Sequence, residues 1–200
     1  MRPKDWAFGA EFDIDDYPTL LQMASVFRNS EDTKKIEEYY EKCQKRVNDH
    51  KPVLTIGNKN IEFVQAVKSD DLATNPGLDQ YIRLAMKTSS TRWSHIGYGS
   101  GGTTANPSVS DTVLNTEYGT GRISCFSVLG WARVAGMKIF FGGIVGETTV
   151  ASPINEVGVF NASSAGIMLN HNYFNQVPLT RILGRSVFIL SPVFQIAPKA

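Results

Sequence analysis

The sequence has 200 residues, of which 42% are hydrophobic and 20% charged, so we expect a globular chain that buries one large core or two small ones. Its 20 basic and 19 acidic side chains leave a formal net charge of +1, which predicts neither nucleic acid nor a membrane surface as a partner. No apolar run approaches the ~20 residues that span a bilayer, and the acidic start of the chain lacks the apolar part of a secretory signal, so we expect a soluble protein made inside a cell.

Residues 1–90 carry most of the charge and indicate three helices. The first is expected over residues 20–27, and the second over residues 31–49, where apolar side chains recur at spacings of three and four. The second helix ends before Pro52, because proline disfavours a helical residue in front of it. The third is expected over residues 78–86. We therefore expect this part of the chain to be a charged, mainly helical region.

Two short β-prone runs also lie in the N-terminal region, at residues 53–56 and 61–64. They flank the polar segment Gly57-Asn58-Lys59-Asn60. Runs of this kind, joined by a few residues that include glycine and asparagine, are typical of a hairpin. One hairpin is therefore expected inside the helical region.

Residues 91–200 are poor in acids and rich in glycine, serine, threonine and β-branched residues. Alternating and short apolar runs between small-residue turns predict strands at 123–134, 137–145, 157–160, 167–169 and 186–196. Parallel strands need helix-length crossovers, and the sequence has none between these runs. The expected fold is α+β: a mainly helical N-terminal region, then an antiparallel β-sandwich over about residues 92–196, with the domain boundary near residue 90.

Two of the predicted strands are apolar on both faces. Adjacent Phe140 and Phe141 place rings on opposite sides of the strand at 137–145, and the run at 123–134 has the same pattern. A strand that is apolar on both sides needs cover on both sides. Either the N-terminal region or another subunit is expected to supply that cover, and the second arrangement is common in proteins that assemble.

The segment Gly97-Tyr98-Gly99-Ser100-Gly101-Gly102 has the G-x-G-x-x-G spacing of dinucleotide-binding loops. Such a loop binds phosphate where a helix begins, because free N–H groups there point at the ligand. Here the glycines lead instead into a run that contains Pro107 and has a poor helix start, and no lysine completes the other common phosphate loop. We therefore interpret the segment as a tight turn, in which glycine supplies positive φ.

Several short segments form a recognisable pattern when taken in order. They are residues 75–82 (NPGLDQYI), 93–101 (WSHIGYGSG), 110–117 (SDTVLNTE) and 154–162 (INEVGVFNA), followed by 166–169, 173–174 and a closing β-run at 186–196. Together they resemble a family of tailed-virus structural proteins found in phage tail, baseplate and fibre gene clusters. The resemblance covers about three-fifths of the chain and leaves out residues 1–74. It departs from the family at 178–184, where a lysine and a glycine usually precede the last strand.

The resemblance implies a virion structural protein of the tail, baseplate or fibre-attachment region, without catalytic residues, cofactor or metal. Its location would be the virion, after assembly in the host cytoplasm. Its partners would be other virion proteins and copies of itself in a symmetric ring or trimer, with no nucleic acid and no membrane. Within the loop at 97–121 we expect contacts from Tyr98, Asp111, Leu114 and Glu117.

Other classes of function stay open. A capsid decoration or head-fibre protein is one, and a host-binding module for carbohydrate, which would carry an exposed aromatic patch, is another. An enzyme would need a pocket that gathers His95 or His171 with a carboxylate. These histidines and His50 lack the i+3 or i+4 spacing of zinc ligands, and no G-x-S-x-G nucleophile motif is present.

Two smaller groups of residues leave alternatives. Asp13, Asp15 and Asp16 could hold a hard cation or form an exposed acidic turn, and the glycine and distal glutamate of an EF-hand are missing. Cys43 and Cys125 lie far apart in the sequence, and we favour two thiols over a disulfide, because a chain of this size does not need a covalent staple.

Glu156 is our candidate for a structural ion pair, because it is an acid inside an apolar strand-like run of the acid-poor region. If its side chain is buried, its charge needs a partner, since an unpaired buried charge is unfavourable. The alternative is an exposed strand glutamate. The expected partner, within the fold or across a subunit contact, is one of four arginines: Arg122, Arg133, Arg181 or Arg185.

Overall fold

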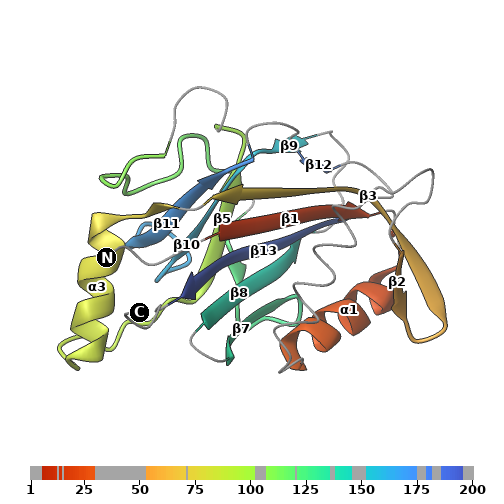
Figure 1. Ribbon diagram of the computed structural model, residues 1–200, viewed down its shortest axis with the longest axis horizontal. Helices are drawn as coiled ribbons and strands as arrows, with labels where there is room; N and C mark the ends of the chain where they lie inside the picture. The colour runs from red at the N-terminus through yellow and green to blue at the C-terminus, as the bar shows by residue number, and fades with distance from the viewer. Residues whose placement is uncertain are drawn as a thin grey trace, which may run out of the picture.

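The computed structural model describes residues 6–12, 14, 16–29, 53–70, 72–101, 107–119, 121–135, 138–145, 152–174, 179–181 and 186–195. Within these residues the chain forms two helices and thirteen strands, and all strand pairings are antiparallel (Figure 1). No helix in the described part of the chain is long and apolar enough to cross a membrane.

Six strands from both ends of the sequence form the larger sheet. In spatial order they are β2 (Val53–Ile56), β3 (Lys59–Asp70), β1 (Trp6–Phe12), β13 (Ser186–Gln195), β8 (Lys138–Val145) and β7 (Gly130–Ala135). The central strand β1 lies between β3 and β13, so residues near the start and the end of the described chain are hydrogen-bonded neighbours.

The second sheet has five strands, and two further short strands pair only with each other. In spatial order the five are β4 (Leu72–Ala73), β11 (Met168–Tyr173), β10 (Glu156–Phe160), β5 (His95–Gly99) and β6 (Ile123–Ser124). The separate pair is β12 (Leu179–Arg181) with β9 (Ser152–Ile154).

The two larger sheets share one apolar core. Phe141 and Val145 on β8 belong to the same cluster of buried side chains as Ile96 on β5 and Val157 and Val159 on β10. Because the inner faces of both sheets are apolar, burying them against each other removes both from water at once.

Helix α1 (Tyr17–Asn29) covers the opposite face of the six-stranded sheet. Met23 and Phe27 of the helix cluster with Trp131 and Phe140 of the sheet, and the rings of Phe27 and Trp131 stack with centroids 5.6 Å apart. Phe140 therefore packs beneath α1, while Phe141 packs between the sheets. The strand that is apolar on both faces is covered on both faces by its own chain, so it gives no reason to require a second subunit.

Helix α3 (Asn75–Ala85) begins beside the five-stranded sheet and is capped by Thr74, whose hydroxyl accepts a hydrogen bond from the Gly77 N–H. A Cβ atom at Gly77 would lie 2.5 Å from the carbonyl oxygen of Leu169 on β11. Only glycine lets the first turn of the helix approach the strand this closely.

The expected fold class, a mainly helical N-terminal region followed by one sandwich, is wrong. The structure has two short helices and several antiparallel sheets, and β1, β2, β3 and β4 of the N-terminal region pair into the same sheets as the later strands. Strand β1 was missed because Ala7 and Ala10 are buried on opposite faces, so its sequence shows no alternation of polar and apolar residues. The domain boundary expected near residue 90 does not separate the sheets.

The local predictions had better outcomes. The helices at 20–27 and 78–86 are confirmed as α1 and α3, and the hairpin is confirmed as β2 and β3 around Gly57 and Asn58. The predicted run at 123–134 is divided between β6 and β7, which belong to different sheets. The helix expected at 31–49 lies outside the described residues.

We predict that Phe27→Ala lowers the free energy of unfolding by about 3–4 kcal/mol, because Phe27 is buried and loses its stacking on Trp131. The measurement is chemical denaturation followed by circular dichroism. The matched control is Val26→Ala on the exposed side of the same helix, which should change stability by less than about 0.5 kcal/mol. Equal effects of the two substitutions would contradict the packing of α1 on the sheet.

Candidate functional site

Residues 107–119, which we call the covering loop, lie on the outer face of the five-stranded sheet. Leu114 of this loop forms a buried cluster with Phe160 on β10 and Met168 on β11. Backbone hydrogen bonds fix the loop along the end of β5: the Ser100 N–H donates to the Thr116 carbonyl at 3.0 Å, and the Tyr118 N–H donates to the Tyr98 carbonyl at 3.0 Å. The loop therefore covers this sheet as α1 covers the other one.

The buried carboxylate of Glu156, on β10, joins the loop to the sheet. Its Oε1 atom accepts hydrogen bonds from the backbone N–H groups of Gly101 at 2.9 Å and Thr116 at 2.7 Å. Its Oε2 atom accepts one from the Asn115 N–H at 2.9 Å and lies 3.1 Å from Nε2 of His171. Both oxygen atoms of this fully buried carboxylate thus have two partners each.

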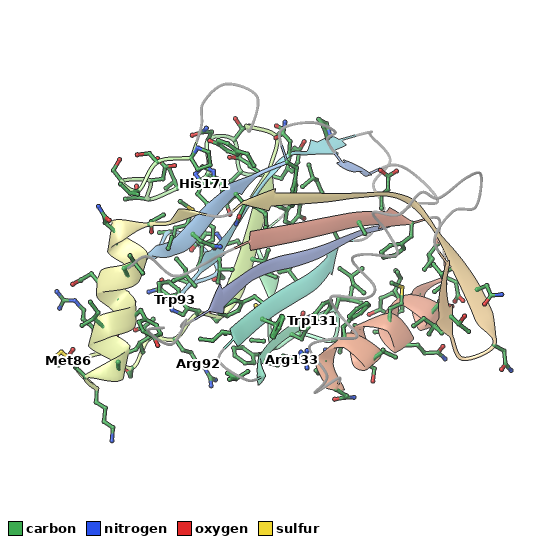
Figure 2. The ribbon with its side chains drawn as sticks, viewed as in Figure 1. Met86, Arg92, Trp93, Trp131, Arg133 and His171 are labelled. Carbon is green, nitrogen blue, oxygen red and sulfur yellow. The ribbon has the colours of Figure 1, made fainter. Side chains whose placement is uncertain are left out.

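His171, on β11 and labelled in Figure 2, continues the chain of contacts from Glu156 to Asp111. Its Nδ1 atom lies 2.7 Å from Oδ2 of Asp111 in the covering loop, and the same carboxylate oxygen accepts a hydrogen bond from the Ser108 N–H at 2.8 Å. The imidazole is completely buried, and the ring of Tyr173 packs edge-on against it with centroids 4.6 Å apart. The result is a continuous chain, Asp111–His171–Glu156, which we call the buried triad.

The surroundings of Glu156 favour its charged form. Burial alone would raise the pKa of this carboxyl group, but the hydrogen bonds from His171 and from the N–H groups of Thr116, Asn115 and Gly101 outweigh burial, and the pKa lies below its ordinary value of 4.5. The negative charge also affects a neighbour. Burial, together with the charges of Glu156 and Asp111, raises the pKa of Tyr173 to about 12.

A second ion pair holds the end of the covering loop. The guanidinium of Arg122 donates from Nε to Glu117 Oε1 at 2.6 Å and from Nη2 to Glu117 Oε2 at 3.0 Å. Its remaining nitrogen donates to the carbonyl groups of Ala162 at 3.0 Å and Ala165 at 2.5 Å, and its carbon lies 3.4 Å above the centre of the Phe160 ring. A two-pronged pair of this kind fixes orientation as well as distance.

Three glycines of the G-x-G-x-x-G segment make this arrangement possible. A Cβ atom at Gly99 would lie 2.0 Å from the Thr116 carbonyl oxygen, and one at Gly101 would lie 2.7 Å from Oε1 of Glu156. At Gly97 it would lie 2.7 Å from the Phe160 ring. The glycines therefore let a loop and a carboxylate of the same chain approach the backbone. The expected tight turn with positive φ is wrong for these three glycines, because Gly97 and Gly99 lie in strand β5 and none of the three has a positive φ. The anion beside them is Glu156.

The buried triad combines a histidine with two carboxylates, which is the grouping that an enzyme would require. However, His171 and Glu156 are both completely buried, and every carboxylate oxygen of Glu156 already has partners. A general base must be able to reach a proton of its substrate. The bonds of Glu156 therefore hold the covering loop against the sheet, and we call this arrangement the clasp.

The four predicted contact residues lie at this site, but the chain uses them internally. Tyr98 and Leu114 are buried, at 5% and 4% exposure. Asp111 bonds to His171, and Glu117 to Arg122. Contacts of these residues with another subunit stay a prediction, and the two buried side chains have almost no surface to offer.

The arginine partner expected for Glu156 is replaced by a histidine. Of the arginines considered, Arg122 pairs with Glu117, and Arg133 lies over the Phe140 ring at 4.8 Å; the side chains of Arg181 and Arg185 lie outside the described residues. One signal in the sequence points to His171, which interrupts a β-prone run together with two asparagines. The three backbone donors to Glu156 have no sequence signal, because every residue except proline supplies an N–H group.

The other candidate groups, the acidic residues before Pro18 and the cysteines, form no site among the described residues. Among the described residues no group of three histidine, cysteine, aspartate or glutamate side chains is arranged so that it could hold a metal ion. Asp16 is hydrogen-bonded by Lys59 and Thr19, while Asp13 and Asp15 lie outside the described part. Cys125 is a free, buried thiol whose pKa is raised by burial to about 12, and its predicted thiol state is confirmed; Cys43 is not among the described residues.

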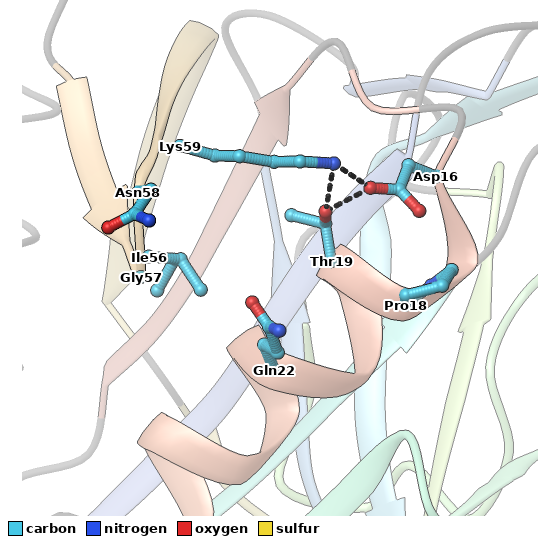
Figure 3. Close-up of a pocket in the computed structure, with 8 residues that line it drawn as sticks. All are labelled: Asp16, Pro18, Thr19, Gln22, Ile56, Gly57, Asn58 and Lys59. Carbon is cyan, nitrogen blue, oxygen red and sulfur yellow. Dashed lines mark hydrogen bonds and ion pairs between the residues drawn. The ribbon is translucent and has the colours of Figure 1, made fainter.

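A shallow pocket lies between the start of α1 and the β2–β3 turn, and none of its lining residues belongs to the buried triad (Figure 3). Its lining consists of Asp16, Pro18, Thr19, Gln22, Ile56, Gly57, Asn58 and Lys59. The charged groups of this pocket satisfy each other, since Lys59 bonds to both Asp16 and Thr19. It contains no aromatic ring on which a sugar could stack.

The chain matches no protein-family model, and no curated protein shows significant similarity to it.

We predict that Gly99→Ala destabilises the fold by at least about 2 kcal/mol, because the added methyl group would collide with the Thr116 carbonyl and with Glu156. Gly119→Ala is the matched control in the covering loop, since a Cβ atom there meets nothing within 4 Å. The control should change stability by less than about 0.5 kcal/mol in the same denaturation experiment. If both variants behave alike, the close approach of loop and strand is incorrect.

We predict that acid releases the covering loop. A carboxyl group with a lowered folded pKa stabilises the fold above its unfolded pKa, and that contribution disappears as pH falls through the folded value, here below 4.5. Amide hydrogen exchange at Gly101, Asn115 and Thr116, corrected for intrinsic rates, should lose protection in that range. Glu156→Gln should remove the protection already at neutral pH, because its amide presents a donor to backbone donors. Protection that is independent of pH and of this substitution would show that Glu156 does not hold the covering loop in place.

Proposed function

We propose that this chain is a structural protein of a tailed-virus particle that acts in the tail, baseplate or fibre-attachment region through protein–protein contacts. The proposal rests on the resemblance of residues 75–196 to that class and on the positions of the resembling segments. The segments at 93–101, 110–117 and 154–162 supply β5, the covering loop and β10, which meet at Glu156. The shared pattern thus coincides with the residues that hold one surface loop in place.

The observation that carries the proposal is that the carboxylate, imidazole and guanidinium groups at the site bond to one another. The carboxylates of Asp111 and Glu156 bond to His171, and Glu117 bonds to Arg122. Such bonding leaves no group for acid–base or nucleophilic chemistry. It produces instead a loop of fixed shape, which binds partners with a smaller loss of conformational entropy than a mobile loop.

The exposed side chains of the covering loop are the natural contact points under this proposal. Thr112, Val113, Asn115 and Thr116 are exposed, and Val113 is an apolar side chain with 58% exposure. They replace the buried Tyr98 and Leu114 as the residues of this region that can reach another protein.

The carbohydrate-binding alternative receives less support from the described residues. Tyr17 and Phe126 are the large aromatic side chains with high exposure there, and the guanidinium of Arg92 lies 4.5 Å from the centre of the Phe126 ring. They lie on different elements of the fold, one in α1 and the other in the turn after β6. A sugar site normally combines aromatic and polar groups in one concavity.

We predict that the chain is present at fixed copy number in purified virus particles and that immunogold labelling places it at the tail end. Particles would be grown from a virus whose own gene is disrupted and complemented with variants. Val113→Asp should lower incorporation several-fold, because the charge disturbs an apolar contact of the covering loop.

Val26→Asp, on the exposed side of α1, serves as the control and should leave incorporation unchanged. Absence of the chain from particles would contradict the proposal. Labelling on the head would favour the capsid-decoration alternative, and particle assembly without the gene but failure to attach to cells would favour a host-binding module.

A further inference from the structure

Strand β7 forms one edge of the six-stranded sheet, and it differs from the other described edges. It has six residues, whereas β4 and β6 at the edges of the five-stranded sheet have two each. The opposite edge, β2, has four residues and is followed by the charged Lys59. Short strands and lysines are the usual protection of an edge against pairing with another chain. Strand β7 has neither.

The register shows which backbone groups of β7 point away from the sheet. The Ile144 N–H donates to the Leu129 carbonyl at 2.9 Å, so Leu129 and Ile144 are a hydrogen-bonded pair. Hydrogen-bonded and non-hydrogen-bonded pairs alternate along antiparallel strands. Trp131 and Arg133 therefore bond to β8, and the backbone groups of Gly130, Ala132 and Val134 point outward.

Gly130 confirms this direction and sets the limit of the open edge. Its N–H donates to the Ser127 carbonyl at 3.2 Å, and its carbonyl accepts a hydrogen bond from the Arg28 guanidinium at 2.9 Å. Arg28 also binds the carbonyl groups of Ser127 and Val128, so the beginning of the edge is occupied. Among the described residues, the outward N–H and C=O groups of Ala132 and Val134 have no backbone partner.

The side chains around this edge are apolar and exposed. Val134 has 72% exposure, and Phe126 and Val128, in the turn that leads into β7, have 57% and 60%. The one charged residue of the strand, Arg133, turns toward its own sheet and lies over Phe140. An exposed edge of this length with an apolar border is the type of surface that pairs with another strand.

We propose that β7 is a dimerisation edge, which pairs in antiparallel orientation with β7 of a second copy of this chain. Antiparallel pairing of one strand with itself is twofold symmetric, so Ala132 and Val134 of each copy supply both the donors and the acceptors that the other copy needs. The two six-stranded sheets then become one continuous sheet across the twofold axis. Such pairing satisfies the open backbone groups and covers Val134.

This pairing does not depend on the virion role, because it requires only the edge of the folded chain. It is tested on the purified full-length protein, whereas the virion role is tested on particles. A failure of one therefore leaves the other in place.

The experiment is sedimentation equilibrium of the wild type, Val134→Lys and Val113→Lys. The wild type and Val113→Lys should be dimeric, because Val113 is an exposed valine far from β7 in the fold. Val134→Lys should raise the dimer dissociation constant at least about tenfold, because each copy would bring a positive charge to the shared edge and the two charges would repel. Val134→Pro tests the backbone: it removes only an outward N–H group, so it should leave the β8 pairing and the circular dichroism spectrum intact while abolishing dimers.

Amide hydrogen exchange separates strand pairing from a contact of side chains alone. Exchange at Ala132 and Val134 should be slow in the dimer and become fast on dilution, while Trp131 and Arg133 stay protected in both states. The proposal is overturned if the wild type is monomeric at its highest soluble concentration, if the dimer is indifferent to both Val134 substitutions, or if the amides of Ala132 and Val134 exchange rapidly within the dimer.

Discussion

This part of the structure depends on the hydrogen bonds made by the buried carboxylate of Glu156. An isolated carboxylate inside a protein is strongly unfavourable, so its position requires donors that arrive from several directions. Here they come from Gly101 after β5, from the covering loop and from His171 on β11. One charge therefore fixes the relative positions of three segments, and removing any donor leaves the others less well compensated.

Sequence reasoning found the elements whose signals are local. Helix α1 and the β2–β3 hairpin show periodicity or turn residues within a few positions, and so they were predictable. Strand β1 was not, because both of its faces are covered and small residues fill the space. The site could be predicted only in part from the sequence. An acid in an apolar strand indicates that its charge needs a partner. Which residue is that partner depends on the pairing of Gly158 on β10 with His171 on β11, and this register is a property of the whole sheet.

Both faces of the six-stranded sheet are covered by the chain itself, and this changes which surfaces remain for contacts with other subunits. From the sequence alone, Phe140 and Phe141 predict cover by either the N-terminal region or another subunit, since one of the rings must face something apolar. Helix α1 and the five-stranded sheet fill both positions from within the chain. What a compact layered fold still exposes is its strand edges and its loops, because backbone groups at an edge cannot be satisfied by packing from above or below. The surfaces that remain for the contacts proposed above are therefore β7 and the covering loop rather than a sheet face.

The glycine segment shows why a spacing pattern alone does not identify a ligand. Backbone N–H groups that converge where glycine allows close approach attract any anion, whether a phosphate or a carboxylate. What decides between them is whether the chain itself brings an acid to the same point. In this fold Glu156 pairs directly across from Gly99 on the neighbouring strand, so an internal carboxylate occupies the position before any solute can. A glycine-rich segment beside a strand that carries a lone acid is thus better interpreted as an internal anion site, and here that anion fixes the position of the covering loop.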